Sequence, residues 1–393
     1  MIRRVLQLSA LLSVFGVSQY MRILGRGLME RGIRVGIVAL GTGEPPYDRA
    51  WYEERGFDVF LVPGRVPNYR RLTSPGAWRD LSNSLSGLNR AIDTFAPDVL
   101  HANSGLMAML STVGRPLRRN RGALVTCVHG DSQEADKLRM GRIAGRLLPA
   151  SFGRRTIAIS SEMRDFVVGT IGIDERRVRT VFPCVDDRHF RPPSPEERSA
   201  ARRALGVPED AWVVSLVGQY EQRKGHDVLV DAAGLLRQRG TPITVLCAGA
   251  HHEAAAYKEA LMRRAAERGV AEGMILLGHS DAREVLWASD CGVLPSRKEG
   301  FGLVVVEGMA CGVVQVRTPS AGARDTTIDG ETGYVVPFDD PAAIADRLGA
   351  LRADPVLRER MAARSIEYAR ERFSAAAMVA ETLAVYEEAV GGR

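Results

Sequence analysis

The sequence contains few cysteines, and none of them stands in a pattern of known use. Five of the 393 residues are cysteine, and no Cys-x-x-Cys spacing occurs. This argues against a disulfide framework and against the common cysteine-based zinc sites. Cys127, Cys247 and Cys311 lie in apolar runs, so we expect them to be small buried core residues. An odd, scattered set of thiols is typical of a reducing compartment, which predicts a cytoplasmic protein.

Long apolar runs are also absent. No stretch reaches the ~18 uninterrupted apolar residues that a membrane-spanning helix needs. Residues 1–16 combine two arginines with an apolar stretch, so a short signal peptide is an alternative interpretation. Gln7 and Ser9 interrupt the apolar stretch, and no convincing cleavage site follows it. We therefore favour a first strand that leads directly into a helix.

Two further motifs are missing. No Gly-x-Gly-x-x-Gly follows the first expected strand, which argues against a dinucleotide-dependent oxidoreductase. The sequence also has no Asp-x-Asp motif and no clustered His, Asp and Glu residues at the usual spacing of metal ligands. We therefore expect no metal site and no cofactor.

Length and composition are those of a globular protein with more than one domain. The apolar fraction is 45% and the charged fraction 25%, which is ordinary for a globular chain. A length of 393 residues favours two or three domains, each large enough to bury a core.

The positive charge is concentrated in the first half of the chain. Residues 1–190 hold 28 Lys and Arg against 18 Asp and Glu, a net charge of +10. Residues 191–393 hold 25 against 29, a net charge of −4. The first half is therefore the expected surface for an acidic partner.

The first part of the chain alternates strand-like and helix-like segments. A strand is expected at residues 2–8, Ser18 is a plausible cap for a helix that runs to Glu30, and residues 34–40 form the next strand. This order opens a doubly wound parallel sheet. Further strands are expected at residues 57–62, 97–103, 123–130 and 156–162, the last of them in the first domain, with a helix over residues 81–95.

The second part of the chain repeats this alternation after a proline-rich stretch. Residues 192–195 are expected to mark the boundary between two domains. We therefore predict an α/β protein with two doubly wound parallel sheets. The expected strands of the second domain are residues 212–218, 243–249, 274–279, 291–295 and 313–317, and helices are expected after Lys224, over residues 285–288 and over residues 375–389.

The most distinctive stretch runs from Glu299 to Glu307. Two glycines surround a phenylalanine after the first glutamate, and an apolar run precedes the second. Gly300 and Gly302 would let the backbone approach a ligand closely. A helix that begins near Gly302 would direct its first amides at an anion, and a carboxylate at each end could hold hydroxyls. This pattern favours a nucleotide-sugar site, although periodicity alone also allows a buried strand at residues 303–306 with two solvated glutamates.

The same stretch resembles the signature of the retaining glycosyltransferases of family 4, which have the GT-B fold. Pro295-Ser296 precedes it and a Gly-Met-Ala-Cys-Gly run closes it. The resemblance continues in order along nearly the whole chain. It implies two Rossmann-like domains that face each other across a cleft. The acceptor-side domain would comprise residues 1–190 with a C-terminal helix at 375–393, and the nucleotide-sugar-binding domain residues 191–374.

The resemblance also implies roles for single residues. Glu307 would hold the ribose hydroxyls and Glu299 the hydroxyls of the sugar. Lys224 and the amides of residues 301–304 would stabilise the diphosphate leaving group. His129 would face the donor sugar, with His101 as a supporting or core histidine. The expected catalytic residues are His129, Glu299 and Lys224, and the expected donor-binding residues are Glu307, Gly300, Phe301, Gly302, Leu303, Val304, Arg223, Gln219, Gly278, His279 and Gly16.

Several positions depart from the pattern of the family. Gln219 stands where the family has an arginine, and the nearby Arg223 is a candidate for the missing charge. Residues 183–186 replace an Asn-Gly-Val-Asp run, and Asp325 replaces a glutamate. Gly16 stands alone where the family has two adjacent glycines. These differences bear on the hinge contacts and on the choice of donor.

We therefore predict a hexosyltransferase that moves a sugar from a nucleotide-diphosphate donor to a hydroxyl acceptor, with retention at the anomeric carbon and without a metal. The acceptor is a glycan, a lipid-linked molecule or a small molecule, and no nucleic-acid partner is expected. One alternative is a non-catalytic nucleotide-sugar-binding subunit of a larger transferase, which the departures at Gln219, Pro183 and Asp325 leave open. A second alternative is a phosphorylase on the same fold, whereas the two glutamates disfavour an epimerase.

Basic residues cluster in the part of the chain that should hold the acceptor. Residues 137–148 interleave apolar and basic side chains, which is typical of a basic amphipathic helix. We therefore expect an anionic acceptor, or an anionic membrane that presents it, with the protein peripheral at the inner face in the second case. An ordinary surface helix and a solvated excess of arginine are the alternatives. The cluster comprises Arg115, Arg118, Arg119, Arg121, Lys137, Arg139, Arg142, Arg146, Arg154 and Arg155.

Overall fold

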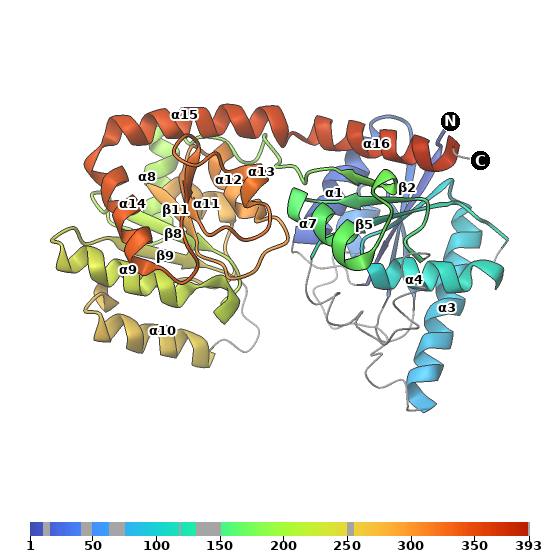
Figure 1. Cartoon of the computed structure of the whole chain (residues 1–393), viewed down its shortest axis with the longest axis horizontal. Helices are drawn as coiled ribbons and strands as arrows, with labels where there is room; N and C mark the ends of the chain where they lie inside the picture. The colour runs from blue at the N-terminus through green and yellow to red at the C-terminus, as the bar shows by residue number, and fades with distance from the viewer. Residues whose placement is uncertain are drawn as a thin grey trace. The chain divides into compact units, whose positions relative to one another are not determined.

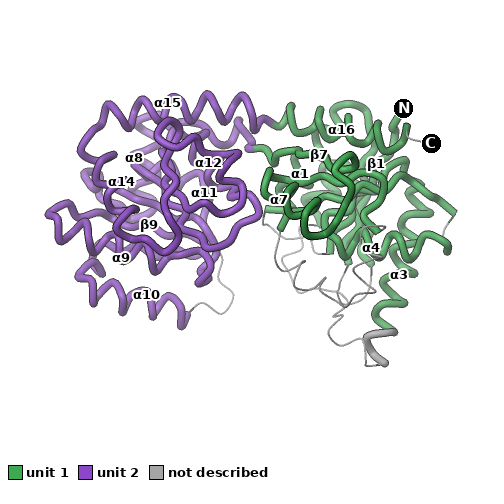
Figure 2. The backbone as a smooth tube through the Cα atoms, in the orientation of Figure 1, with its two compact units in different colours: residues 1–184, 375–393 green, residues 185–374 purple. Residues whose placement is uncertain are grey.

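The chain folds into two compact α/β units. The computed structural model describes residues 1–10, 16–40, 49–62, 75–117, 119–130, 151–249 and 255–391. Unit 1 comprises residues 1–184 with 375–393, and unit 2 comprises residues 185–374 (Figure 2). Each described unit holds one parallel sheet, as the strand and helix alternation predicted.

Unit 1 is built on a seven-stranded sheet with the order β3-β2-β1-β4-β5-β6-β7, and all of its pairings are parallel. Figure 1 labels two of its strands, β2 and β5. Its central strands are apolar on both faces, which is typical of parallel sheets that helices cover on both sides. The strands are β1 (Arg4–Ser9), β2 (Arg34–Leu40), β3 (Asp58–Val62), β4 (Val99–Ala102), β5 (Ala123–Val128), β6 (Arg155–Ala158) and β7 (Val178–Thr180).

Helices cover both faces of this sheet. Leu6 and Leu8 of β1 pack in one cluster with residues of α3 and α4, whereas Gln7, which points to the opposite face, donates through Nε2 to the carbonyl of Met21 in α1. Helix α16 packs against α1 and against β5 and β6. The helices of the unit are α1 (Gly16–Met29), α2 (Arg49–Glu53), α3 (Pro75–Phe95), α4 (Gly105–Gly114), α7 (Ser161–Phe166) and α16 (Ala375–Gly391).

Three predictions for unit 1 need correction. Ser18 is not the cap of the first helix, because α1 already begins at Gly16 and Ser18 is buried in its first turn. Strand β6 is not the last strand of the unit, because the short β7 pairs beside it. The predicted helix at residues 81–95 begins earlier, at Pro75, where the fixed φ of proline suits a first helical turn.

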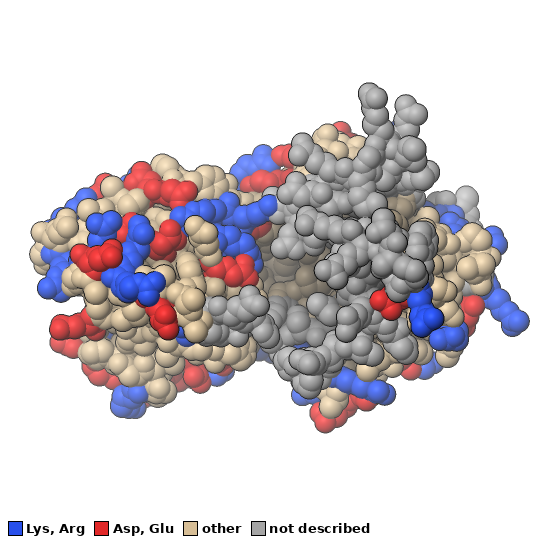
Figure 3. Space-filling model, turned by 90° about the horizontal axis from the view of Figure 1, so that it is seen from below, with Lys and Arg blue, Asp and Glu red and all other residues tan. Residues whose placement is uncertain are grey.

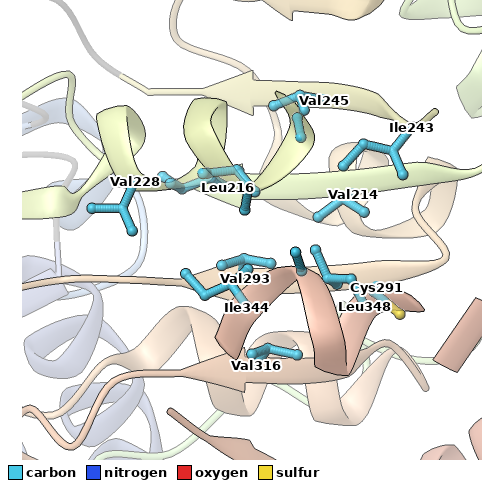
Figure 4. Close-up of a cluster of buried hydrophobic side chains, with 14 of the residues drawn as sticks. Val214, Leu216, Val228, Ile243, Val245, Cys291, Val293, Val316, Ile344 and Leu348 are labelled. Atoms are coloured by element: carbon cyan, nitrogen blue, oxygen red, sulfur yellow. The ribbon is translucent and has the colours of Figure 1, made fainter. Parts of the chain in front are cut away.

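Unit 2 is built on a six-stranded parallel sheet with the order β10-β9-β8-β11-β12-β13. Figure 4 shows Val214 and Leu216 of β8, Val293 of β11 and Ile344 of α14 packed in its core. The strands are β8 (Val213–Val217), β9 (Thr244–Ala248), β10 (Met274–Leu276), β11 (Cys291–Leu294), β12 (Val314–Arg317) and β13 (Gly333–Val335).

The helices of unit 2 pack in pairs, α9 against α14, α8 against α11 and α12 against α15. On the face that Figure 3 shows, basic and acidic side chains of this unit are interspersed, in keeping with its small net charge. The helices are α8 (Pro195–Ala204), α9 (His226–Gln238), α10 (Ala255–Glu267), α11 (Ala282–Ala288), α12 (Leu303–Ala310), α13 (Ala323–Thr326), α14 (Pro341–Ala353) and α15 (Pro355–Arg372).

The proline-rich stretch has a different role from the one predicted. The chain changes unit between Cys184 and Val185, before the expected boundary, and returns to unit 1 between Ser374 and Ala375. Pro195 instead occupies the first turn of α8, where Ser194 and Glu197 form a reciprocal capping box. The prolines therefore start a helix of unit 2.

Two further expectations concern membranes. The predicted basic helix at residues 137–148 lies outside the described residues, as does Arg118. Among the residues that the structure describes, no helix is both long enough and apolar enough to cross a bilayer.

Candidate functional site

The sheet order of unit 2 creates a place for a ligand between β8 and β11. From β8 the chain winds outward through β9 and β10, and from β11 it winds the other way through β12 and β13. In open parallel sheets, ligands bind outside the carboxyl ends of the strands at such a change of direction. The loops that follow β8 and β11 carry most of the predicted donor residues.

The loop after β11 ends in the helix that the sequence predicted. Gly302 has a φ of 80° and occupies the N-cap of α12, so its left-handed backbone turns the chain into the helix. The alternative of a buried strand at residues 303–306 is therefore wrong. Leu303 and Val304 form the first turn and are partly exposed, so their amides lie where an anion can reach them.

The predicted residues on either side of this turn are both buried. The Phe301 ring is buried, with its edge against Phe373 at a centroid distance of 5.7 Å, so Phe301 can offer a ligand only its backbone. Glu307 lies one turn into α12 and is 7% exposed. Gly312 has a φ of 76° and ends the helix, as predicted.

Lys224 and Glu299 meet across the ends of β8 and β11. Lys224 Nζ donates to Glu299 Oε1 at 2.6 Å, and the two side chains are only 13% and 8% exposed. Burying two charges is costly unless they are closely paired. Lys224 and Glu299 therefore form a buried ion pair at the two positions for which the resemblance implies contacts with the diphosphate and the sugar.

Gln219 and Arg223 also come together in the loop after β8. Arg223 forms an ion pair with Glu221, and its Nη2 lies 3.3 Å from Gln219 Oε1. The main-chain N–H of Arg297 donates to the Arg223 carbonyl, and the Arg297 guanidinium pairs with Asp227 at 2.8 Å. These bonds brace the loop after β8 against the loop after β11.

Glycines let the neighbouring strand ends approach each other. A Cβ at Gly249 would lie 2.0 Å from the Gly218 carbonyl oxygen, so no side chain fits there. The Gly249 N–H donates to the Gly278 carbonyl at 3.0 Å. Gly278 and His279, which were predicted to bind the donor, are exposed beside this junction.

The predicted histidines of unit 1 form a cluster at the carboxyl ends of β4 and β5. His129 Nε2 lies 3.1 Å from Asn103 Oδ1, and the Tyr20 ring meets His129 edge-on at 4.9 Å. His101 is fully buried, and its Nδ1 lies 2.7 Å from the Tyr386 hydroxyl. His101 is therefore a core histidine, as expected, and His129 is the partly exposed member.

Desolvation keeps both rings neutral. It lowers the pKa of His129 to about 4 and, together with repulsion from His129, the pKa of His101 to about 3. At neutral pH, the His129 ring can donate or accept a hydrogen bond but does not carry a positive charge.

Gly16 is the first residue of α1, beside the change of winding direction between β1 and β4. Among the described residues, no atom lies within 4 Å of a Cβ built at this position. The described part of the fold therefore does not require glycine there, and the close approach of a ligand stays a prediction.

The comparisons with known proteins agree with these features. A family model described as "Glycosyl transferases group 1" matches residues 197–372, and one described as "Glycosyltransferase Family 4" matches residues 14–189. A D-inositol 3-phosphate glycosyltransferase of Xylanimonas cellulosilytica is 33% identical over 96% of this chain and 93% of its own length. One of Thermomonospora curvata is 30% identical over 90% of this chain and 86% of its own.

This chain belongs to glycosyltransferase family 4.

Solved structures share its fold. HepE of Anabaena, in complex with UDP and glucose, matches with a TM-score of 0.80 at 18% identity, over 98% of this chain and all of that one. Sucrose-phosphate synthase of Thermosynechococcus elongatus matches with a TM-score of 0.81 at 18% identity, over 100% of both chains. The predicted GT-B architecture of two parallel-sheet α/β domains is confirmed.

The role of one buried residue of this glycosyltransferase was not predicted from the sequence. Arg317, at the end of β12, is fully buried and donates to Thr326 Oγ1 at 2.6 Å and to the carbonyls of Phe301 and Ala321 at 3.4 and 3.1 Å. It thereby joins the loop after β11 to the loop after β12. The only signal in the sequence is a charged residue at the end of an expected strand.

In unit 2, the glycosyltransferase brings together Lys224 with Glu299, and Gln219 with Arg223, and it sets Gly302 at the start of the helix that carries Glu307. Among the described residues, no three His, Cys, Asp or Glu side chains are grouped as metal ligands.

Proposed function

We propose that this glycosyltransferase transfers a hexose from a nucleotide-diphosphate sugar to a hydroxyl of an anionic acceptor, with retention at the anomeric carbon and without a metal ion. The proposal rests chiefly on one observation, which is the Lys224–Glu299 pair beside the amino end of α12 at the switch point of unit 2. A cation, helix amides and a carboxylate are the groups that a sugar diphosphate needs.

Different residues of unit 2 would bind the diphosphate, the sugar and the ribose of the donor. The amides of Leu303 and Val304 and the ammonium of Lys224 would bind the diphosphate, whose charge grows as the sugar departs. Groups fixed toward developing charge lower the barrier most, because they need no reorganisation during the reaction. Glu299 would accept hydrogen bonds from the sugar, and Glu307 from the ribose.

Binding of the donor requires the buried ion pair to change partners. Lys224 Nζ would pass from Glu299 to a phosphate oxygen, which frees the Glu299 carboxylate for sugar hydroxyls. The exchange keeps both charges paired, so it avoids the cost of leaving one of them buried alone.

His129 would act as a neutral hydrogen-bonding group toward the donor sugar. The support is its place at the carboxyl end of β5, its partial exposure and its lowered pKa of about 4. A neutral imidazole can hold a sugar hydroxyl without adding a charge that would compete with Lys224.

For the acceptor, we propose a small molecule that carries a phosphate. The relatives are named for D-inositol 3-phosphate, and residues 1–190 of this chain carry a net charge of +10. A reaction with a soluble sugar nucleotide also fits a reducing cytoplasm, since none of the five buried cysteines, all of them within the described residues, forms a disulfide.

The direct test is turnover of a panel of nucleotide sugars by the purified chain with inositol 3-phosphate and other polyol phosphates, followed by mass spectrometry. The expected result is one preferred donor and a product heavier by one hexose. A bound donor with no turnover would instead favour the binding subunit. Release of a sugar 1-phosphate when inorganic phosphate is the acceptor would favour the phosphorylase.

Metal independence has its own test. The same assay after dialysis against EDTA should keep its rate, because Lys224 and the helix amides neutralise the leaving group. A complete loss of turnover that Mg²⁺ or Mn²⁺ restores contradicts this part of the proposal.

A further inference from the structure

A second pocket lies at the opposite edge of the sheet of unit 1. It has a volume of about 460 Å³ and is lined by residues 97–98 before β4, 122–124 at the start of β5 and 153–154 before β6. These segments are the amino ends of three neighbouring strands. Ligands of open parallel sheets bind at the carboxyl ends, so this pocket is separate from the reaction site.

Three arginines line this pocket. Arg115 follows the carboxyl end of α4, Arg121 precedes β5 and Arg154 precedes β6. Within the described ranges, none of the three forms an ion pair with a carboxylate. A cation is favourable after a helix, which accounts for Arg115. The same reason applies to Arg154, whose Nη1 donates to the carbonyl of Ala389 in the last turn of α16 at 3.1 Å, but not to Arg121.

Nearby arginines of the same unit are used differently. Arg155 and Arg179 share the carboxylate of Glu388 in α16, at 2.8 and 3.1 Å. Arg177 donates to the carbonyl of Gly153. The fold therefore neutralises Arg155 and Arg179 with a carboxylate, whereas the three arginines around the cavity have no carboxylate partner within the described ranges.

The other polar groups of the lining do not cancel this charge. Asp98 is the only carboxylate among the lining residues, and it already accepts the backbone N–H groups of Arg3 and Arg4 at 2.7 and 2.9 Å. Ser111 is also one of the lining residues, and its hydroxyl is fully buried and has no hydrogen-bond partner within the described residues. An anion with several acceptor oxygens would match this lining.

We propose that this pocket binds a small phosphate-bearing ligand, apart from the donor and the acceptor. Its volume lies in the range of small-molecule sites, which is roughly 300–1,000 Å³. Arginine is the side chain best suited to phosphate, because its planar guanidinium donates two parallel hydrogen bonds. The phosphate can belong to a soluble metabolite or to a lipid headgroup.

Calorimetric titration with pyrophosphate at constant ionic strength tests the proposal. Wild type should bind two pyrophosphates, one at the donor site and one in the pocket. The variant Arg115→Gln/Arg121→Gln/Arg154→Gln should lose one of the two, since each lost charged hydrogen bond weakens binding about tenfold. Lys224→Met should lose the other.

The control variant is Arg26→Gln/Arg79→Gln/Arg119→Gln, which removes the same charge from exposed arginines that do not line the pocket. It should retain both sites. Arg121→Gln alone, in an exposed loop, repeats the test if the triple pocket variant does not fold. Equal pyrophosphate binding by the pocket and control variants overturns a soluble phosphate as the occupant.

Sedimentation with phosphatidylglycerol and phosphatidylcholine vesicles separates the two sources of phosphate. Binding to the anionic vesicles that only the pocket variant loses assigns the pocket to a lipid headgroup. Loss of pyrophosphate binding without an effect on vesicles assigns it to a soluble ligand. If the pocket and control variants behave alike in both assays, the proposal is wrong.

Discussion

Three charged side chains carry the donor chemistry that we propose, and each is held by a different part of unit 2. Lys224 precedes α9, Glu299 follows β11, and Glu307 lies within α12. The spacing of Glu299 and Glu307 is visible in the sequence, because that motif is local. The contact between Lys224 and Glu299 could not be predicted, because it joins loops 75 residues apart.

Arg317 shows the same limit more strongly. Its partners are backbone carbonyls and a threonine hydroxyl, drawn from several loops. Backbone carbonyls cannot be recognised as acceptors from the sequence, since every residue has one. Only the folded arrangement reveals that a buried guanidinium joins the loop after β11 to the loop after β12.

The first prediction concerns Glu307. Glu307→Gln keeps the shape of the side chain but removes its charge, so it should weaken binding of the nucleoside diphosphate by about 1.5–3 kcal/mol, or roughly 10–150-fold. Fluorescence or calorimetric titration measures the change. Glu272→Gln, at an exposed position of the same unit, is the matched control. Unchanged affinity in Glu307→Gln would rule out its role.

The second prediction concerns His101 and His129. The folded pKa values of His101 and His129, about 3 and about 4, lie below the ordinary value of about 6.5. Between these values the unfolded chain binds more protons than the folded one, so stability should fall as the pH drops from 7.5 to 5. The urea midpoint of unfolding at the two pH values measures this loss.

His101→Gln should reduce that pH dependence, because it removes one of the groups that must stay neutral in the fold. His189→Gln, at a partly exposed position, serves as the control and should show the full wild-type loss. An identical drop of the midpoint in wild type and His101→Gln contradicts the assigned cause.

At the scale of single elements, the predicted helix boundaries are correct where local chemistry determines them. The start of α12 follows from Gly302, and its end from Gly312. The predictions are wrong where two local signals compete. Ser18 looks like a cap but lies inside α1, and the prolines near residue 195 look like a linker but open α8. Their true roles depend on neighbouring segments that pattern alone does not locate.

The third prediction concerns the turn into α12. Gly302→Ala forces a side chain into a left-handed backbone, which costs about 1–2 kcal/mol, and its Cβ would lie 3.0 Å from Leu294 Cδ2. Both stability and donor affinity should fall. Gly349→Ala, within α14 and without a close contact, should leave both unchanged or raise stability. Wild-type donor affinity in Gly302→Ala would show that the turn does not position the donor.

At the scale of the whole molecule, the fold class was predictable because parallel strands buried on both faces give unmistakable apolar runs between helices. The point where the chain changes unit was predicted only to within several residues. Donor and acceptor identity could not be predicted, since they depend on side chains that loops bring together. The division of charge between the two halves is visible in the sequence, but the pocket that gathers Arg115, Arg121 and Arg154 is not.

The central claim is that the Lys224–Glu299 pair serves the donor rather than the fold. Lys224→Met alone leaves a buried carboxylate unpaired, which should cost about 3–5 kcal/mol of stability. The double variant Lys224→Met/Glu299→Gln removes both charges and should recover most of that stability. Its folding can be verified from its urea midpoint before any activity is measured.

The decisive measurement is therefore the turnover number of the double variant with the preferred nucleotide sugar at saturation. We predict a loss of about 100- to 1,000-fold relative to wild type, as for removal of a group that stabilises developing charge. A stable double variant that turns over at the wild-type rate would contradict the account, because the pair would then serve only the fold.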